Sequence, residues 1–164
     1  MTVPADAAPR PLWMNTLAAA EGRLAALPLW PALLMLRIAL AVPFFRSGLT
    51  KWDGFGTLSP GVVYLFTEEF RLHLGVATVP YPMPLAMAWL AGAAEIVLPA
   101  LLVVGLLTRL SALGILAMTV VIQLTVPEGW TNFHLPWAAM ALALVVLGGG
   151  LASIDAAMMR DRRN

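Results

Sequence analysis

The sequence contains no cysteine, and charged residues make up only 12% of its 164 residues. The lack of cysteine excludes disulfides, thiolate nucleophiles and cysteine-ligated iron–sulfur clusters within this chain. The formal net charge is only +1, so there is no basic field to attract nucleic acid, and we expect no nucleic-acid partner. With only two histidines and no HxxxH pattern, we also expect no protein-only metal centre.

Hydrophobic residues, in contrast, make up 60% of the chain. A soluble protein of this length has too little interior to hide so much apolar surface, whereas lipid accepts apolar side chains on the outside of a fold. The composition therefore predicts an integral membrane protein of the all-α class, and the lipid bilayer is its first expected partner.

Four apolar stretches have the length and composition of membrane-spanning helices, at about 31–48, 84–107, 110–126 and 136–147. The second and third are joined by so short a link that they must form an antiparallel hairpin. The fourth is short for a hydrocarbon core of about 30 Å, so we expect its helix to continue through Gly148, Gly149 and Gly150 to Ile154. These stretches predict a four-helix bundle over residues 30–157, followed by a basic cytoplasmic tail at 158–164.

Two segments lie outside the four spans. Residues 1–29 read as an N-terminal extension that is disordered over 1–11 and an interfacial helix over 12–27; its start lacks the apolar core of a secretory signal. In the first loop between spans, Ser59 and Pro60 form a helix start signal, and the residues after them predict a short helix over 61–74. Its mixed apolar and charged residues favour a position along the outer membrane surface or against the mouth of the bundle.

The distribution of basic residues predicts the orientation in the membrane. With both termini in the cytoplasm, six basic residues lie inside and three lie outside. Cytoplasmic loops carry the excess of lysine and arginine in membrane proteins, so both termini are expected to be cytoplasmic. The inner group is Arg10, Arg23, Arg109, Arg160, Arg162 and Arg163, and the outer group is Arg46, Lys51 and Arg71.

Arg37 and Glu95 are the sharpest candidates for a buried site, because each lies inside a predicted span. An ionisable group in hydrocarbon costs about 2.5–3.5 kcal/mol on insertion scales and is usually turned inward and paired. Their heights along the two helices predict an ion pair, which either holds the helices together or forms part of a ligand site. Gln123 is the one strongly polar residue of the third span.

A second group of candidates lies at the outer mouth of the predicted bundle. It consists of Glu128, Trp130 and His134 in the loop before the fourth span, with Lys51 and Trp52 at the end of the first span. Histidine as a hydrogen-bonding group and tryptophan as a stacking wall could receive a quinone head group. The alternative is that the tryptophans are interfacial anchors and the histidine is solvated.

Several of these segments together resemble the DoxX family of small bacterial membrane proteins. They are Arg37–Lys51 with its Gly48-x-x-Lys51 pattern, Glu95 followed by Gly105-Leu-Leu-Thr-Arg109, then Trp130…His134-Leu-Pro-Trp137, and Gly148-Gly-Gly-Leu-Ala-Ser-Ile-Asp155. The resemblance implies a four-helix protein of the bacterial inner membrane. It also implies association with quinone-linked oxidoreductases, or with redox-stress and metal-stress complexes.

These observations lead to three alternative functions. The first is a membrane subunit or accessory of such a complex, whose groove around Arg37, Glu95 and His134 could receive a quinone. Nothing in the sequence identifies the cofactor, and the pattern leans against an enzyme as an isolated chain. The second is a transporter or binding protein for a small or lipophilic solute, with Glu95 as its gate. The third is a structural partner, in a complex or a homo-oligomer. One histidine for haem and scattered methionines for copper give those two cofactors only weak support.

Overall fold

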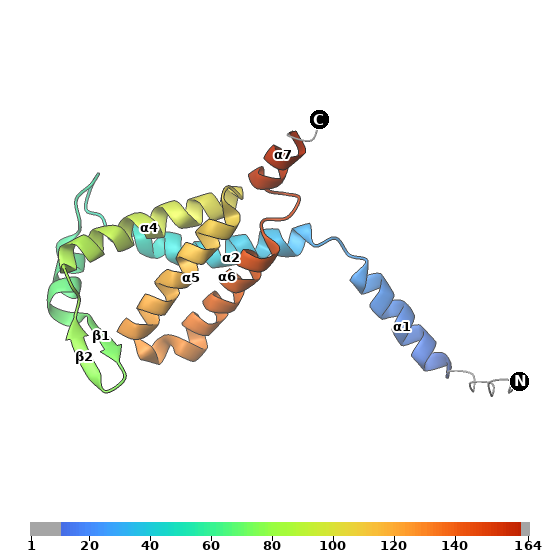
Figure 1. Cartoon of the computed structure of the whole chain (residues 1–164), viewed down its shortest axis with the longest axis horizontal. Coiled ribbons are helices and arrows are strands. Elements are labelled where there is room, and N and C mark those ends of the chain that lie inside the picture. The colour runs from blue at the N-terminus through green and yellow to red at the C-terminus, as the bar shows by residue number, and fades with distance from the viewer. Residues whose placement is uncertain (1–10, 162–164) are drawn as a thin grey trace, which may run out of the picture.

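The computed structural model describes residues 11–161, which are mostly helical (Figure 1). The first half of the chain contains α1 (Leu12–Ala25), α2 (Trp30–Leu49), α3 (Pro60–Tyr64), the π-helix η1 (Leu65–Glu69) and the strands β1 (Arg71–Leu74) and β2 (Ala77–Pro80). The second half contains α4 (Pro84–Val104), α5 (Thr108–Thr125), the short turns η2 (Pro127–Gly129) and η3 (Trp130–His134), α6 (Leu135–Leu147) and α7 (Ile154–Asp161).

Four helical stretches are long and apolar enough to cross a bilayer, and the predicted all-α membrane fold is confirmed. They are α2, α4, α5 and the continuous run Pro127–Leu147, which joins η2 and η3 to α6. The buried side chains at their centre are apolar and come from all four stretches; they include Leu40, Phe44, Leu102, Ile115 and Leu144. Many other apolar residues of the spans are exposed, as lipid allows; they include Met35, Leu90, Leu110 and Leu142.

α1 lies apart from the bundle. Each of its residues is exposed, and Figure 1 shows it extending away from the four packed helices. A helix therefore occupies most of the predicted range 12–27, while its position at the membrane interface stays a prediction. The predicted disorder over 1–11 falls outside the described residues except for Pro11, and so do residues 162–164 of the predicted tail.

The link between α4 and α5 is a tight turn with two left-handed residues. Gly105 ends α4 with φ +74°, and the N–H of Leu106 bonds the carbonyl of Leu101 at 3.0 Å. This bond satisfies a carbonyl that the helix end leaves unpaired. The predicted hairpin of spans is thus present, but α4 ends at Val104 and not at 107 as the sequence pattern suggested.

The fourth span corrects the prediction that its helix continues to Ile154. The helix ends at Leu147, and Gly148 has φ +78°, a backbone conformation that no α-helix can include. The span reaches membrane length at its other end, because the predicted loop at 127–135 is itself helical, as η2 and η3. α7 is a separate helix after the break.

The first loop also differs from prediction in its second half. Ser59 caps α3 as expected, since its side chain accepts a hydrogen bond from the N–H of Val62 at 3.4 Å. The helical stretch, however, ends at Glu69, and β1 and β2 then form an antiparallel hairpin in place of the predicted helix to 74. The hairpin is held against the end of α5, because His73 Nδ1 lies 3.0 Å from the Leu124 carbonyl.

Candidate functional site

A cavity of about 400 Å³ opens between α2, α4 and α5 and is covered on one side by η1 and the residue after β2. Its wall is mainly apolar and unusually rich in aromatic rings, contributed by Phe44, Phe66, Phe70, Tyr81 and Trp137. The charged side chains that line it are Lys51 and Glu95. An apolar pocket of this size with a few convergent polar groups is typical of a site for a small lipophilic molecule.

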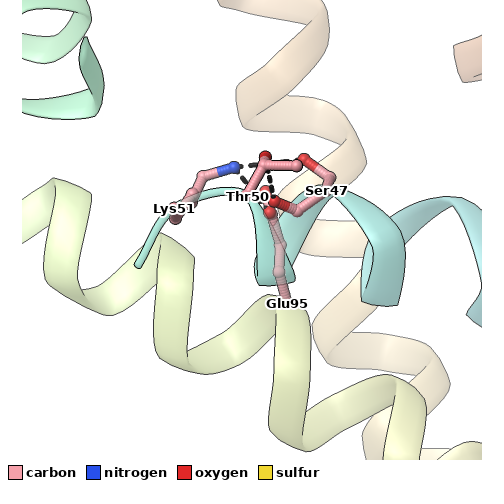
Figure 2. A network of polar contacts seen from close by, with 4 residues as sticks. All are labelled: Ser47, Thr50, Lys51 and Glu95. Atoms are coloured by element: carbon pink, nitrogen blue, oxygen red, sulfur yellow. Dashed lines mark hydrogen bonds and ion pairs between the residues drawn. The ribbon is translucent and has the colours of Figure 1, made fainter. Parts of the chain in front are cut away.

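Lys51 and Glu95 form a buried ion pair in the cavity wall, shown in Figure 2. Lys51 Nζ lies 2.6 Å from Glu95 Oε2 and donates a second hydrogen bond to Ser47 Oγ at 3.1 Å. The two side chains are only 13% and 6% exposed. Lys51 follows the end of α2, where its N–H bonds the Gly48 carbonyl at 3.1 Å, so its long side chain turns back toward α4.

Close packing of α2 on α4 brings the pair together. A Cβ atom on Gly48 would lie 2.9 Å from the carbonyl carbon and oxygen of Glu95, so only glycine permits this approach. Gly92, one turn earlier on α4, likewise leaves room for the ring of Trp52, whose edge packs against Trp89 with ring centroids 4.7 Å apart. Trp52 therefore packs on α4 beside the pair.

The predicted ion pair between Arg37 and Glu95 is wrong. The guanidinium of Arg37 is 2% exposed and donates to three backbone carbonyls, of Val103 at 2.7 Å and of Gly149 and Ala152 at 2.9 Å each. Val103 lies in the last turn of α4, whose carbonyls have no partner within the helix, and the other two lie in the break after α6. Arg37 thus joins three elements at the end of the bundle away from the hairpin.

Asp155 completes this polar cluster and was absent from the predicted site residues. Its carboxylate accepts hydrogen bonds from the N–H groups of Leu107 and Thr108 at 2.8 Å each, and from Thr108 Oγ1 at 2.7 Å. Burial raises the pKa of the Asp155 carboxyl, but the bonds from Thr108 and Leu107 and the charge of Arg37 outweigh burial, so that the pKa lies below its ordinary value. Asp155 therefore acts as an anionic cap at the start of α5.

Gln123 and His134 form a second polar pair, as their positions on facing spans allow. His134 Nδ1 lies 2.6 Å from Gln123 Oε1, and Gln123 Nε2 donates to the Pro127 carbonyl at 3.2 Å. His134 is buried, and its ring centroid lies 5.6 Å from that of Trp137, which lines the cavity. His134 is therefore beside the cavity wall and not part of it.

The predicted mouth cluster is divided in the structure. Glu128 and Trp130 are exposed, while Lys51 contacts Glu95, Trp52 contacts Trp89 and His134 contacts Gln123. Within residues 11–161, no hydrogen bond, ion pair or ring contact joins Lys51 or Trp52 to the group around His134. Phe66 and Phe70 lie in the loop segment for which the sequence offered packing on the mouth of the bundle, but the cavity that they line with Tyr81 was not predicted, because spacing along one segment does not show which side chains meet across several.

Comparison with known proteins agrees with the membrane fold. The DoxX family model matches residues 32–128, which is more than half of the chain. This chain belongs to the DoxX family. A protein from Haemophilus influenzae, described as an uncharacterized protein, is 31% identical over 76% of this chain and 81% of its own length. No solved structure matches the chain.

The matched range contains Lys51, Glu95 and Arg37, whereas Asp155 lies beyond it. The segments that first suggested the family are also the ones that make contacts in the structure. Gly48 and Lys51 meet Glu95 at one end of the bundle, and Arg37 meets the residues after α6 at the other. In this chain α2 thus contributes to two polar clusters, one around Arg37 in its first half and one around Lys51 just after its end.

Proposed function

We propose that this DoxX protein is a membrane subunit that binds a lipophilic molecule of the quinone class in the cavity between α2, α4 and α5. In this proposal it serves a quinone-linked oxidoreductase, or a redox-stress or metal-stress complex, in the bacterial inner membrane. The observation that carries it is a mainly apolar cavity of about 400 Å³ with one buried ion pair in its wall. A quinone has the matching shape, with an apolar body and a polar head.

The residues of the cavity fit such a ligand. Aromatic side chains offer stacking surfaces to a flat ring, and the ammonium of Lys51 can donate a hydrogen bond to a carbonyl oxygen of the head group. When bound, a quinone supplies two-electron redox chemistry, while the side chains of this chain bind it, orient it and exclude water. The reaction itself would belong to a partner protein, because we assign no catalytic residue to this chain.

The test is to purify the protein from its native membrane and to quantify extracted quinones and co-purified proteins by mass spectrometry. Ala94 lines the cavity on α4, so Ala94→Trp should fill the space and remove the bound molecule. Ala100 is exposed on the same helix and lies outside the cavity, so Ala100→Trp is the matched control. Ala117→Trp blocks the cavity from α5 if the first variant folds poorly.

We expect about one quinone-class molecule per chain in the wild type and in Ala100→Trp, and little in the two blocked variants. Equal amounts in all four proteins would mean that the quinone is carried by the surrounding lipid, and the proposal would fall. Recovery of a partner oxidoreductase with the wild-type protein would support the role as a subunit.

A transporter for a small lipophilic solute is the second candidate, favoured by the buried carboxylate of Glu95 in the cavity wall. Flux of the bound molecule across vesicles that contain only this protein distinguishes the two. Transport driven by a pH gradient and abolished by Glu95→Gln would favour the transporter, whereas tight binding without flux would favour the subunit.

A further inference from the structure

The polar wall of the cavity indicates which kind of head group it recognises. Two of its hydroxyl groups are already committed, because Tyr81 OH and Thr125 Oγ1 lie 2.5 Å apart and Thr125 Oγ1 also donates to the Val121 carbonyl. The charged groups that face a ligand are those of the Lys51 and Glu95 pair, and Ser47, whose hydroxyl accepts from Lys51, lies beside them in the wall.

The hydrogen bonds of this pair leave one donor and one acceptor side by side. An ammonium has three N–H groups, and among the described residues Lys51 Nζ donates to two partners, Glu95 Oε2 and Ser47 Oγ. Glu95 Oε1 accepts no hydrogen bond from any residue in the same range. A group that binds here can therefore accept from Lys51 and donate to Glu95 at once.

The charge of the pair further restricts the kind of head group that can bind. The charges of the ammonium and the carboxylate cancel, so a charged head group gains no net attraction to offset the cost of its desolvation in an apolar cavity. A carbonyl or an ether can only accept, which would leave a carboxylate oxygen of Glu95 desolvated without a partner. A neutral hydroxyl group can accept from Lys51 and donate to Glu95, so it satisfies both side chains.

The apolar part of the cavity favours a ring next to that hydroxyl. Phe44 and Trp137 pack with ring centroids 5.0 Å apart, and Phe66 and Tyr81 pack at 5.5 Å, so aromatic faces and edges line the space from two sides. Aromatic pairs add to the free energy gained by area burial alone.

We infer that the cavity selects neutral, lipophilic phenols, whose ring packs among these aromatic side chains and whose hydroxyl accepts from Lys51 Nζ and donates to Glu95 Oε1. This inference rests on the proposed function and deepens it. A reduced quinone carries such a hydroxyl and its oxidised form does not, so the pair favours the reduced form.

Three probes of one shape test the inference on the wild-type protein in nanodiscs: para-hexylphenol, its methyl ether and para-hexylbenzoate. Binding is followed by isothermal titration calorimetry, and the heat that persists in Ala94→Trp is subtracted as partition into lipid. The phenol should bind at least about tenfold more tightly than the ether, because the ether leaves a buried acceptor unpaired. The benzoate, an anion at neutral pH, should also bind at least about tenfold more weakly than the phenol.

The outcomes separate this inference from the proposed function. Equal affinity for phenol and ether, with both blocked by Ala94→Trp, would overturn the inference and leave the cavity as a ligand site. Benzoate binding as tight as that of the phenol would also overturn it. If none of the probes and no quinone shows binding that Ala94→Trp blocks, the proposed function fails as well. Should Glu95→Gln fold, its preference for phenol over ether should shrink, because the neutral amide oxygen is a weaker acceptor than the carboxylate.

Discussion

Arg37 in α2 and Lys51 just after it are both largely buried cations, and the fold stabilises their charges in different ways. Lys51 presents a compact charge and pairs with one carboxylate, so the two formal charges cancel. Arg37 presents a planar group with five donors, and three backbone carbonyls share its charge without any direct ion pair. The first arrangement leaves hydrogen-bonding capacity that faces a cavity, whereas the second uses the guanidinium to join chain segments.

At the residue scale, we predict that Lys51 and Glu95 depend on each other for stability. Lys51→Met or Glu95→Gln should each lower the free energy of unfolding by about 1–3 kcal/mol, because the first leaves a buried carboxylate without its cation and the second leaves a buried ammonium without its counter-charge. The double substitution should recover part of that loss, since no lone charge remains. Thermal unfolding in detergent, followed by size-exclusion chromatography, gives all three values.

Arg37 provides the control for this comparison of single and double substitutions. Arg37→Gln and Glu95→Gln should be additive when combined, because these residues bind different partners. Additive losses for Lys51→Met with Glu95→Gln, or recovery for Arg37→Gln with Glu95→Gln, would contradict the pairing seen in the structure.

The sequence was sufficient to identify Arg37 and Glu95 as buried and partnered, because charge inside an apolar span permits few alternatives. It could not identify the partners. Helix heights constrain only residues within helices, whereas Lys51 lies just beyond α2 and turns back. Two of the three carbonyls that bind Arg37, those of Gly149 and Ala152, become available because α6 breaks at Gly148, which the sequence analysis did not anticipate.

At the scale of elements, the spans were predictable and their ends were not. Apolar runs locate helices within a few residues, but the left-handed conformations at Gly105 and Gly148 decide where α4 and α6 end. The β-hairpin was missed even though Gly75 carried a signal for it. Leu74 pairs with Ala77 across a two-residue turn with Gly75 at φ +68°, and a glycine in that position is typical of tight hairpins.

Close approach of α2 and α4 is the contact on which the candidate site depends, and we predict that Gly48→Ala disrupts it. The added Cβ would lie 2.9 Å from the backbone of Glu95, so the helices must separate and the Lys51 to Glu95 bond must lengthen. Overpacking of this kind typically costs about 1–3 kcal/mol. We expect a lower thermal midpoint and weaker binding of the cavity ligand.

Gly22→Ala in α1 is the matched control, because no atom lies within 4 Å of a Cβ placed there. An exposed helical glycine replaced by alanine is neutral or slightly stabilising. Wild-type stability and binding in Gly48→Ala would show that α2 and α4 do not pack as closely as the structure indicates.

At the scale of the whole molecule, an even number of spans places both termini on one side of the membrane. The contacts of Arg37 support this arrangement independently, because they join α2 to the segment between α6 and α7 at one end of the bundle. The hairpin docks on the end of α5, and Figure 1 shows it far from α7. One measurement of sidedness therefore fixes the whole topology.

We predict that the termini are cytoplasmic and the hairpin is external, because six basic residues then lie inside and three outside. A reporter that is active only in the cytoplasm should be active when joined at Asn164, and a reporter that is active only outside should be inactive there. Inserted at Gly75 in the hairpin turn, the same two reporters should give the reverse result. If the outward reporter is active at Asn164, the cavity pair faces the cytoplasm, and any ligand or partner would reach it from that side.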